Sequence, residues 1–272
     1  MFMQNIKVSF TSKKDWLKLK KPNPNSHKGE NGILLVIAGS KKYFGAVFFA
    51  IEAAIRFCDL VYVYSPENKK FLEKLKLQPH IILINKNELK KTLNLADAIL
   101  IGPGMDLNKK TKNLVNQVLK LKKPCVLDAA AIKLANKNLF SDKTILTPHK
   151  KEFFDAFSLK PSLSNIYFMA KKYNTNIILK GREDIICNSK ECKINKTGNV
   201  GLTKGGTGDC LAGLLSALLA TGNDPFLAAS AAAFLNGFSA DLLKKKYSIY
   251  YNTFELTQNL AIAAALIEKN KK

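Results

Sequence analysis

The sequence predicts an α/β fold, with an open, mostly parallel sheet and helices on both of its faces. Two observations indicate this class. Short apolar stretches recur along the 272 residues, and segments of helical periodicity separate most of them, which is typical of a parallel sheet wrapped by helices. Several of these stretches end in small residues, at the edge where such sheets bind their ligands.

The individual elements follow from their apolar patterns. Strands are predicted at Ile33–Ala38, Leu60–Tyr64, Ile81–Ile84, Ala98–Ile101, Cys125–Leu127, Thr144–Leu146, Asn176–Leu179 and Ile185–Cys187, with Lys190–Asn195 as the hairpin partner of the last. Helices are predicted around Asp15–Leu19, Gly45–Phe57, Lys109–Leu121, Ser162–Tyr173, Phe226–Leu243 and Thr253–Lys269, and another follows the glycines at 205–208.

Local signals bound several of these elements. Gly39 ends the first clear strand, and Gly222 follows the helix after the glycines, where a C-terminal cap belongs. Asp224 and Pro225 form an N-cap and a first-turn proline ahead of an Ala-rich helix. No internal repeat or low-complexity linker is found, so we expect one domain at 27–272 after a polar lead-in segment at 1–26.

The composition argues against two functional classes. The formal net charge is +22, which invites a nucleic-acid-binding interpretation. The lysines are nevertheless spread along the whole chain in pairs and triplets, such as Lys13-Lys14 and Lys244–Lys246, without interleaved aromatic residues. This pattern is typical of solvated faces, and a positive field also suits an anionic nucleotide. No apolar run reaches the roughly 18 residues of a membrane span, and we expect a cytoplasmic protein.

The cysteines are predicted to be reduced thiols. Cys58, Cys125, Cys187, Cys192 and Cys210 contain no C-x-x-C pair, and their number is odd. We therefore interpret them as mostly buried thiols rather than disulfides or metal ligands.

The stretch Leu202–Gly213, L-T-K-G-G-T-G-D-C-L-A-G, organises the functional prediction. The first amides of a helix lack partners and form an anion site with the helix dipole, and glycines allow close approach of the backbone. We expect Thr207 to cap the helix through its hydroxyl. A carboxylate beside a phosphate repels it, so Asp209 fits a base that takes a proton from an attacking hydroxyl. A first-turn Asp favoured by the dipole is the structural alternative.

Three other residues follow strands and allow two interpretations each from the residues alone. Asp128 is either a helix cap or a site carboxylate. His149 is either structural or part of a site, and Lys180 either caps a hairpin or faces a nucleotide phosphate. The chain has no Walker A loop and no G-x-G-x-x-G after its first strand.

Six motifs in order resemble one enzyme family over residues 25–265. Lys204–Gly213 is similar to the anion-hole motif of ribokinase-like enzymes, in the longer form found in ADP- or ATP-dependent NAD(P)H-hydrate dehydratases. His27–Ala46, Ile101–Gly104 and Thr147–His149 match further motifs of that family. The resemblance implies the ribokinase-like fold and, since only a lead-in precedes the matching region, the stand-alone form of the dehydratase.

The resemblance also implies roles for individual residues. It places Ala46, Gly104, His149 and Asp209 at the hydrated nicotinamide nucleotide. The adenine nucleotide would bind at Lys180, Gly181, Arg182, Glu183, Asp184 and Gly208, and the anion hole would consist of Gly205, Gly206, Thr207 and Gly208. The chain departs from the family pattern at Ala130, at Lys150-Lys151, which replace a Pro-Gly turn, and at Asn236.

The implied reaction is repair of a damaged cofactor. The substrate is the S form of NADH or NADPH hydrated at C6, the donor is ADP or ATP with Mg²⁺, and with ADP the products include AMP and phosphate. The family further implies a homo-oligomer, a tetramer. The rival interpretations are a ribokinase-like kinase of a small alcohol, such as a vitamin precursor, and a catalytically inactive nucleotide-binding module.

Overall fold

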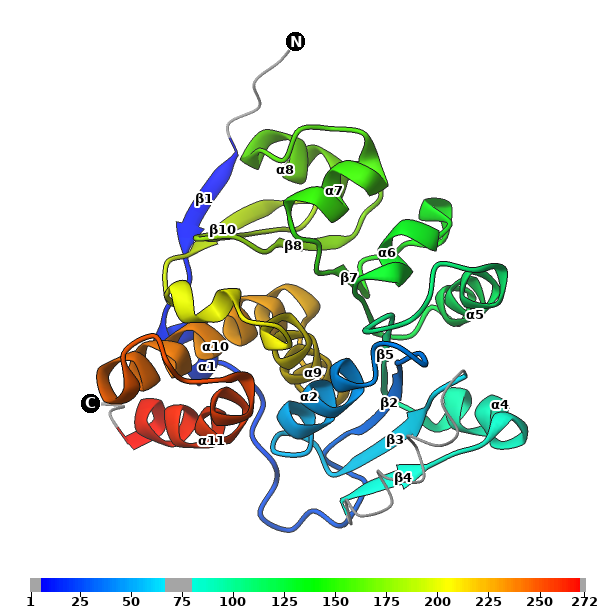
Figure 1. The fold of residues 1–272 in the computed structure, drawn as a ribbon, viewed down its shortest axis with the longest axis horizontal. Helices are drawn as coiled ribbons and strands as arrows, with labels where there is room; N and C mark the ends of the chain where they lie inside the picture. Colours follow the sequence, from blue (N-terminus) through cyan, green and yellow to red (C-terminus); the bar gives the residue numbers. More distant parts are fainter. Residues whose placement is uncertain (1–5, 67–79, 270–272) are drawn as a thin grey trace.

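The computed structural model describes residues 6–66 and 80–269 and is built around one sheet of ten strands (Figure 1). The strands are β1 (Lys7–Phe10), β2 (Ile33–Ile37), β3 (Leu60–Tyr64), β4 (Ile81–Leu83), β5 (Ala98–Ile101), β6 (Cys125–Leu127), β7 (Thr144–Leu146), β8 (Asn176–Leu179), β9 (Asp184–Cys187) and β10 (Glu191–Asn195). All the strands predicted from the sequence are present, within one residue at either end.

The order of strands across the sheet is β1-β10-β9-β8-β7-β6-β5-β2-β3-β4. Every printed pairing is parallel except those of β9 with β8 and with β10. The carboxyl ends of β2, β5, β6, β7 and β8 therefore meet along one edge, which is the edge that binds ligands in folds of this class. The predicted mostly parallel sheet is confirmed.

Helices cover both faces of the sheet (Figure 1). They are α1 (Lys13–Leu17), α2 (Gly45–Ala54), α4 (Lys86–Leu95), α5 (Lys109–Lys120), α6 (Ala130–Leu134), α7 (Lys150–Phe157), α8 (Leu163–Lys172), α9 (Thr207–Ala220), α10 (Pro225–Tyr247) and α11 (Thr253–Lys269), with 3₁₀ turns η1 (Lys137–Leu139) and η2 (Val200–Thr203). Helices α2, α9, α10 and α11 pack on one face, and α4 to α8 pack on the other.

The alternation of side chains along β2 explains why both faces are covered. Leu34 and Val36 belong to the core beneath α2 and α9, whereas Leu35 and Ile37 belong to the opposite core. Successive residues of a strand point to opposite faces, and all four side chains are fully buried. An uninterrupted apolar strand is stable only when helices cover both faces.

Helix α9 approaches α2 unusually closely. A Cβ added to Gly213 would lie 2.0 Å from the carbonyl oxygen of Ala50, so a larger residue would force the helices apart. The glycine of the L-A-G sequence after Asp209 thus serves helix packing, and it anchors the helix whose first turn carries that acid.

The lead-in segment is more integrated than the sequence suggested. Its first five residues lie outside the described ranges, but β1 pairs in parallel with β10 along the whole of its length. Helix α1 buries Trp16, whose ring meets Phe57 edge-on with centroids 5.6 Å apart. The division at residue 26 remains a prediction, but the residues before it supply an edge strand of the sheet.

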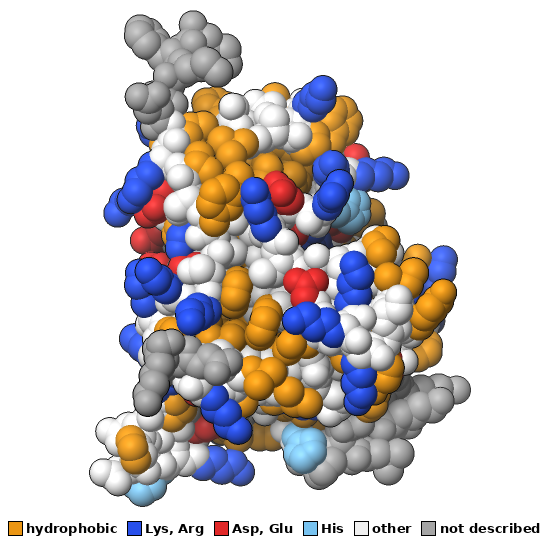
Figure 2. Space-filling view, turned by 90° about the vertical axis from the view of Figure 1, so that its left-hand side faces the viewer, with side chains coloured by type: hydrophobic (Ala, Val, Ile, Leu, Met, Phe, Trp, Pro, Cys, Tyr) orange, Lys and Arg blue, Asp and Glu red, His pale blue; other side chains and the backbone are white. Residues whose placement is uncertain are grey.

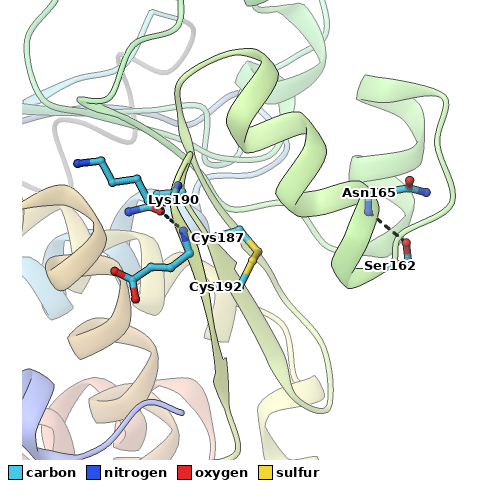
Figure 3. Close-up of a disulfide and its surroundings, with 7 residues drawn as sticks. Ser162, Asn165, Cys187, Lys190 and Cys192 are labelled. Carbon is cyan, nitrogen blue, oxygen red and sulfur yellow. Dashed lines mark hydrogen bonds between the residues drawn. A yellow bond between two sulfur atoms is a disulfide. The ribbon is translucent and has the colours of Figure 1, made fainter. Parts of the chain in front are cut away.

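The prediction that all cysteines are reduced is wrong for one pair. Cys187 and Cys192 form a disulfide between β9 and β10 (Figure 3). The register of the hairpin sets them directly opposite each other, with 4.1 Å between their Cα atoms, so the bond joins two adjacent strands at a closely spaced pair. Cys58, Cys125 and Cys210 are free, as predicted.

Helix α10 is long and apolar enough to cross a membrane, a property that the sequence analysis did not find. Of its apolar window, 72% is buried inside the molecule. Its Ala-rich surface packs against α9 and α11, so the structure uses it as a core helix, as the predicted all-round apolar pattern indicates.

Candidate active site

The loops that follow the central parallel strands are tied side by side at one edge of the sheet. The amide of Gly39 donates to the carbonyl of Pro103 at 2.8 Å, and the amide of Asp128 donates to that of Ile101 at 3.1 Å. The amide of Lys180 donates to the carbonyl of Pro148 at 2.8 Å. The motifs singled out in the sequence therefore gather along one continuous edge.

Ala46 and Gly104, two of the predicted substrate residues, lie against each other. Gly104 has a φ of +64°, and a Cβ on it would lie 2.3 Å from the carbonyl oxygen of Tyr43 and 3.0 Å from the Cβ of Ala46. The site therefore requires glycine at this position, on conformational and on steric grounds. Ala46 stands in the first turn of α2, next to Gly45, whose Cβ position is open.

His149 is half-exposed and caps helix α7. Its Nδ1 accepts the amides of Lys151 and Glu152 at 3.1 and 3.2 Å, while Glu152 Oε2 accepts the amide of His149 at 2.8 Å. This reciprocal arrangement is a capping box. Because Nδ1 accepts, the neutral imidazole carries its proton on Nε2. The loop thus keeps a defined geometry with Lys150-Lys151 in place of Pro-Gly.

The glycine loop is held from both sides. Thr253 Oγ1 donates to the carbonyl of Gly205 at 2.7 Å, and Lys204 Nζ donates to the carbonyls of Ile249 and Tyr251. Gly206 is the N-cap of α9 with a φ of +92°, and a Cβ on it would lie 2.4 Å from the ring of Phe49. Among the described residues, nothing approaches the Cβ position of Gly205 within 4 Å, so its backbone is open to a ligand.

Thr207 does not cap the helix, contrary to prediction. Its hydroxyl lies 2.6 Å from the carbonyl of Leu202 and 3.0 Å from that of Lys204, so it donates back into the loop. The N-cap is Gly206, which has no side chain to accept a helix amide. The amide of Thr207 donates to the carbonyl of Lys204 at 3.4 Å, and no side chain caps the amides that follow it. Those amides are the ones that an anion could accept.

Asp209 is half-buried in the first turn of α9, and its proton affinity is unusual. The pKa of this carboxyl is raised to about 7, mainly by burial and then by the neighbouring charge of Asp128; Lys180 lowers it, and Glu152 adds a smaller rise. Burial and like charges both disfavour the ionised form. A carboxylate with a pKa near 7 is suited to accept a proton at neutral pH.

Lys180 and Asp128 form a buried ion pair beside Asp209. Lys180 Nζ lies 2.9 Å from Asp128 Oδ1, and Thr147 Oγ1 donates to the same oxygen at 2.6 Å. Asp128 is not a helix cap, since the N-cap of α6 is Ala129. Burial lowers the pKa of Lys180, but the charges of Asp128, Glu152 and Asp209 outweigh it and leave that pKa above its ordinary value.

Lys180 also connects this pair with the glycine loop. A Cβ added to Gly208 would meet Lys180 Nζ at 3.4 Å and no other described atom within 4 Å. The ammonium therefore lies beside the first turn of α9, whose leading amides lack partners within the helix. A bound phosphate in this place would meet a lysine and helix amides together.

A cavity of about 1010 Å³ opens beside this turn. It is lined by all the residues predicted for the adenine nucleotide, which are Lys180, Gly181, Arg182, Glu183, Asp184 and Gly208. Its other lining residues are Lys196, Thr197, Gly198, Asn199, Val200, Leu202, Thr203, Thr207, Leu211, Asn236 and Lys244. Four basic side chains in one wide cavity provide a favourable environment for a polyanion.

Asp184 differs from its neighbours in that both carboxylate oxygens are engaged. Oδ1 accepts the amide of Gly181 and Oδ2 accepts Asn195 Nδ2, each at 3.0 Å. Burial raises the pKa of this carboxyl. Its side chain closes the turn between β8 and β9. Only the backbone of Asp184 is therefore left to contact a ligand directly.

The predicted residues thus fall into two neighbouring groups. Ala46, Gly104 and His149 do not line the 1010 Å³ cavity, whereas the nucleotide residues do. Asp209 is electrostatically coupled to Lys180 on the cavity wall and to Glu152, which caps α7 together with His149. Asp209 follows Gly208 of the cavity wall directly in the sequence, and charges from both sides, Lys180 and Glu152, act on it.

Several residues of this region were not predicted as site residues. Asp128 had two possible roles, and Thr147 and Glu152 had none, although Asp128 and Thr147 each directly follow a buried strand. The signal was the position of a polar residue at a strand's carboxyl end. Lys196 and Lys244 carried no comparable signal, because they reach the cavity from outside the motifs.

The basic side chains on one face of the molecule are dispersed. On the face shown in Figure 2, basic side chains are scattered among hydrophobic ones rather than gathered in one strip. A strip of basic residues is the usual footprint of a nucleic-acid-binding surface, and this face lacks it.

Comparison with known proteins identifies relatives over nearly the whole chain. Residues 34–261 match the model of a family described as NAD(P)H-hydrate dehydratase. The ADP-dependent (S)-NAD(P)H-hydrate dehydratase of Nitrosopumilus maritimus is 32% identical over 270 residues, covering 90% of this chain and 92% of that protein.

Two further similarities extend the comparison. The bifunctional NAD(P)H-hydrate repair enzyme of Methanocaldococcus jannaschii is 41% identical over 89% of this chain, and the chain spans about half (50%) of that relative's length. The structure of the ADP/ATP-dependent NAD(P)H-hydrate dehydratase of Bacillus subtilis, co-crystallized with ATP/Mg²⁺, superposes with a TM-score of 0.84 at 26% identity, covering 97% of this chain and 99% of that one.

Proposed function

This chain belongs to the NAD(P)H-hydrate dehydratase family, and we propose that it catalyses the ADP-dependent dehydration of (6S)-NAD(P)H hydrate to NAD(P)H, with release of AMP and phosphate. The observation that carries the proposal is the position of Asp209. It stands in the first turn of α9, beside an open glycine loop and a large basic cavity, with its pKa raised to about 7.

The reaction needs an activated leaving group, because hydroxide leaves carbon poorly. Asp209 accepts the proton of the C6 hydroxyl while that oxygen attacks the terminal phosphorus of ADP, and the bond to the bridging oxygen of AMP breaks. The amides of Gly205 to Gly208 stabilise the charge that spreads over the transferred phosphoryl group. Phosphate then leaves C6 as the ring nitrogen donates its electron pair, and loss of the C5 proton forms the reduced nicotinamide.

The two groups of site residues supply the two substrates. In this proposal ADP occupies the 1010 Å³ cavity, with its phosphates near Lys180 and Gly208. The hydrated nicotinamide ring lies near Ala46, Gly104 and His149, where glycine allows the closest approach of the backbone. The single-domain organisation of residues 27–272 and the roles of the individual residues are part of the proposal.

The described residues hold no cluster of metal-ligating side chains. In residues 6–66 and 80–269, no group of three or more His, Cys, Asp or Glu side chains could hold a metal ion. A magnesium ion bound by nucleotide phosphates and water needs few protein ligands. We therefore assign Mg²⁺ to the nucleotide that enters the site and route no chemical step through protein ligands to it.

The rival kinase interpretation has less support. The hydroxyethylthiazole kinase of Pyrococcus horikoshii superposes with a TM-score of 0.67 at 16% identity, which shows a shared fold alone. A kinase would also use an acid at the helix N-terminus, but it would retain the phosphate on its product. The distinction is therefore chemical and can be measured directly.

The test is an assay of purified protein with hydrated NADH or NADPH, Mg²⁺ and either ADP or ATP. Return of the reduced nicotinamide absorbance, with AMP and phosphate formed in equal amounts from ADP, is the expected result. Absence of the absorbance rise with both donors contradicts the proposal. A screen of small alcohols for phosphorylated products would then examine the kinase interpretation.

Two broader features belong to the same proposal. We expect the protein to act in the cytoplasm, where nicotinamide and adenine nucleotides are used, and to form a homo-oligomer, as the family resemblance implies. Gel filtration with light scattering on the purified protein measures the assembly state, and a monomer would contradict that part.

A further inference from the structure

The charged groups around Asp209 form an arrangement that the reaction itself does not explain. They come from three elements: Asp128 follows β6, Lys180 follows β8, and Glu152 lies on α7. The charges of Asp128, Glu152 and Asp209 all act on the Lys180 ammonium. The place of this ammonium therefore affects Asp209, whose pKa it lowers.

The ammonium is paired with Asp128. The 2.9 Å separation of Lys180 Nζ and Asp128 Oδ1 is that of a charge-assisted hydrogen bond. Asp128 is 3% exposed, and the fully buried Thr147 hydroxyl donates to the same oxygen at 2.6 Å. The carboxylate is thus anchored on one side by a rigid β-branched side chain and on the other by the lysine.

The neighbour of Lys180 on its other side is the first turn of α9. The 3.4 Å approach to the Cβ position of Gly208 brings the ammonium next to the residue that precedes Asp209. If Asp128 were neutral, the ammonium would be left in a largely buried place with Glu152, Asp209 and Asp184 as anionic neighbours, and both oxygens of Asp184 already accept hydrogen bonds. A buried cation without its partner moves toward whatever carboxylate it can reach.

We propose that Asp128 is a positioning residue, which holds the Lys180 ammonium away from Asp209 so that Asp209 stays free to accept the proton of the substrate hydroxyl. The inference rests on the proposed function, since it gives Asp128 a part in that reaction. A direct Lys180–Asp209 pair would lower the proton affinity of Asp209 and occupy the oxygen that must face the substrate. The negative charge of Asp128 also helps to keep the proton affinity of Asp209 high, because it raises the pKa of that carboxyl.

A buried ion pair can have either a structural or a positioning role, and the two roles have different consequences. A purely structural pair affects stability and, through it, the amount of folded enzyme at every pH. A positioning pair shifts the proton affinity of a third group, which moves the pH profile. The chain offers a matched control in Asp15, which is also 3% exposed and paired with a lysine, Lys193, away from the described site.

The experiment compares Asp128→Asn with wild type and with Asp15→Asn. The pKa of Asp209 is followed by carboxyl ¹³C NMR in the full chain without nucleotide, and kcat/KM for dehydration is measured from pH 5 to 9. Asp128→Asn should lower the Asp209 pKa by about one unit or more and move the acidic limb of kcat/KM to lower pH by the same amount. Asp15→Asn should leave both unchanged.

An Asp209 pKa that is the same in Asp128→Asn and wild type overturns the inference, whatever the activities. Because the NMR titration needs no turnover, it decides the inference even if the wild-type enzyme has no dehydratase activity, in which case the proposed function fails separately. If Asp128→Asn does not fold, Thr147→Val removes the anchor and keeps every charge. It should lower the same pKa by a smaller amount, and no change in it likewise overturns the inference.

Discussion

The molecule contains two buried aspartate–lysine pairs that look alike and differ in their surroundings. Asp128 and Asp15 are both 3% exposed, and their partners Lys180 and Lys193 have side chains that are 20% and 18% exposed. Each pair joins segments that are distant in the sequence. By composition and burial alone, the two pairs cannot be told apart.

Their other contacts separate them. Asp15 Oδ2 accepts the amide of Ser12 at 2.9 Å in a capping box, and Lys193 Nζ lies 5.9 Å from the ring centre of Phe226. That pair fastens helix α1 to strand β10. Asp128 caps no helix, and its lysine faces further carboxylates at the ligand-binding edge of the sheet. A buried ion pair therefore indicates function only when its charges act on a third titratable group.

The largest effect is expected from a substitution of Asp209, the titratable group on which the Asp128–Lys180 pair acts. Asp209→Asn keeps the size of the side chain and removes its ability to accept a proton, so turnover should fall by roughly 10²- to 10⁴-fold. The measurement is the initial rate of NADH formation from the hydrate with ADP, with circular dichroism as the check on folding. If the folded variant retains full turnover, Asp209 does not act as the base and only stabilises the first turn of the helix.

The next effect contrasts the two lysines. Lys180→Met should raise the KM for ADP by about 10- to 100-fold, because a charged hydrogen bond to a phosphate contributes roughly 1.5–3 kcal/mol. Lys193→Met removes the matching lysine of the other pair and should leave this KM unchanged. Equal KM values for the two variants would remove the functional distinction between the pairs.

A third prediction concerns stability. Asp15 accepts the Ser12 amide with one oxygen and Lys193 with the other. Asp15→Asn removes the charge and replaces one of these acceptors with a donor, so Lys193 loses its anion, which should lower the free energy of unfolding by about 1–3 kcal/mol. Differential scanning calorimetry should show a midpoint lower by a few degrees, with kcat per folded molecule unchanged. If kcat falls only in proportion to the fraction of folded protein, the Asp15–Lys193 pair is structural. A lower kcat in a fully folded variant would contradict that role.

The smallest effect is the pH dependence of the wild-type enzyme. Asp209 acts in its ionised form, and burial with Asp128 raises its pKa to about 7. Below that pH the fraction of ionised Asp209, and with it kcat/KM, should fall about tenfold for each pH unit. A profile that stays flat from pH 7 to 5 would mean that the proton acceptor has an ordinary carboxyl pKa or is a different group.

The sequence predicted more of the strands than of the helices. Each central strand is a short apolar run, which is easily recognised. Helices α4, α6 and α7 were missed because they are short or carry much polar surface. Helix α4 could have been found, since Asn85 and Glu88 form the N-x-x-E pattern of a capping box before its apolar face.

Local sequence patterns determined three features of this protein: the series of apolar strands, the glycine loop with its acid, and the order of the family motifs. These depend on neighbours along the chain, so residue spacing is enough to predict them. The tertiary structure alone decided that Cys187 pairs with Cys192, that Thr207 donates back into its loop, and that Asp128 binds Lys180. Those contacts depend on strand register and on which loops meet at the sheet edge, and both are set by packing between residues far apart in the chain.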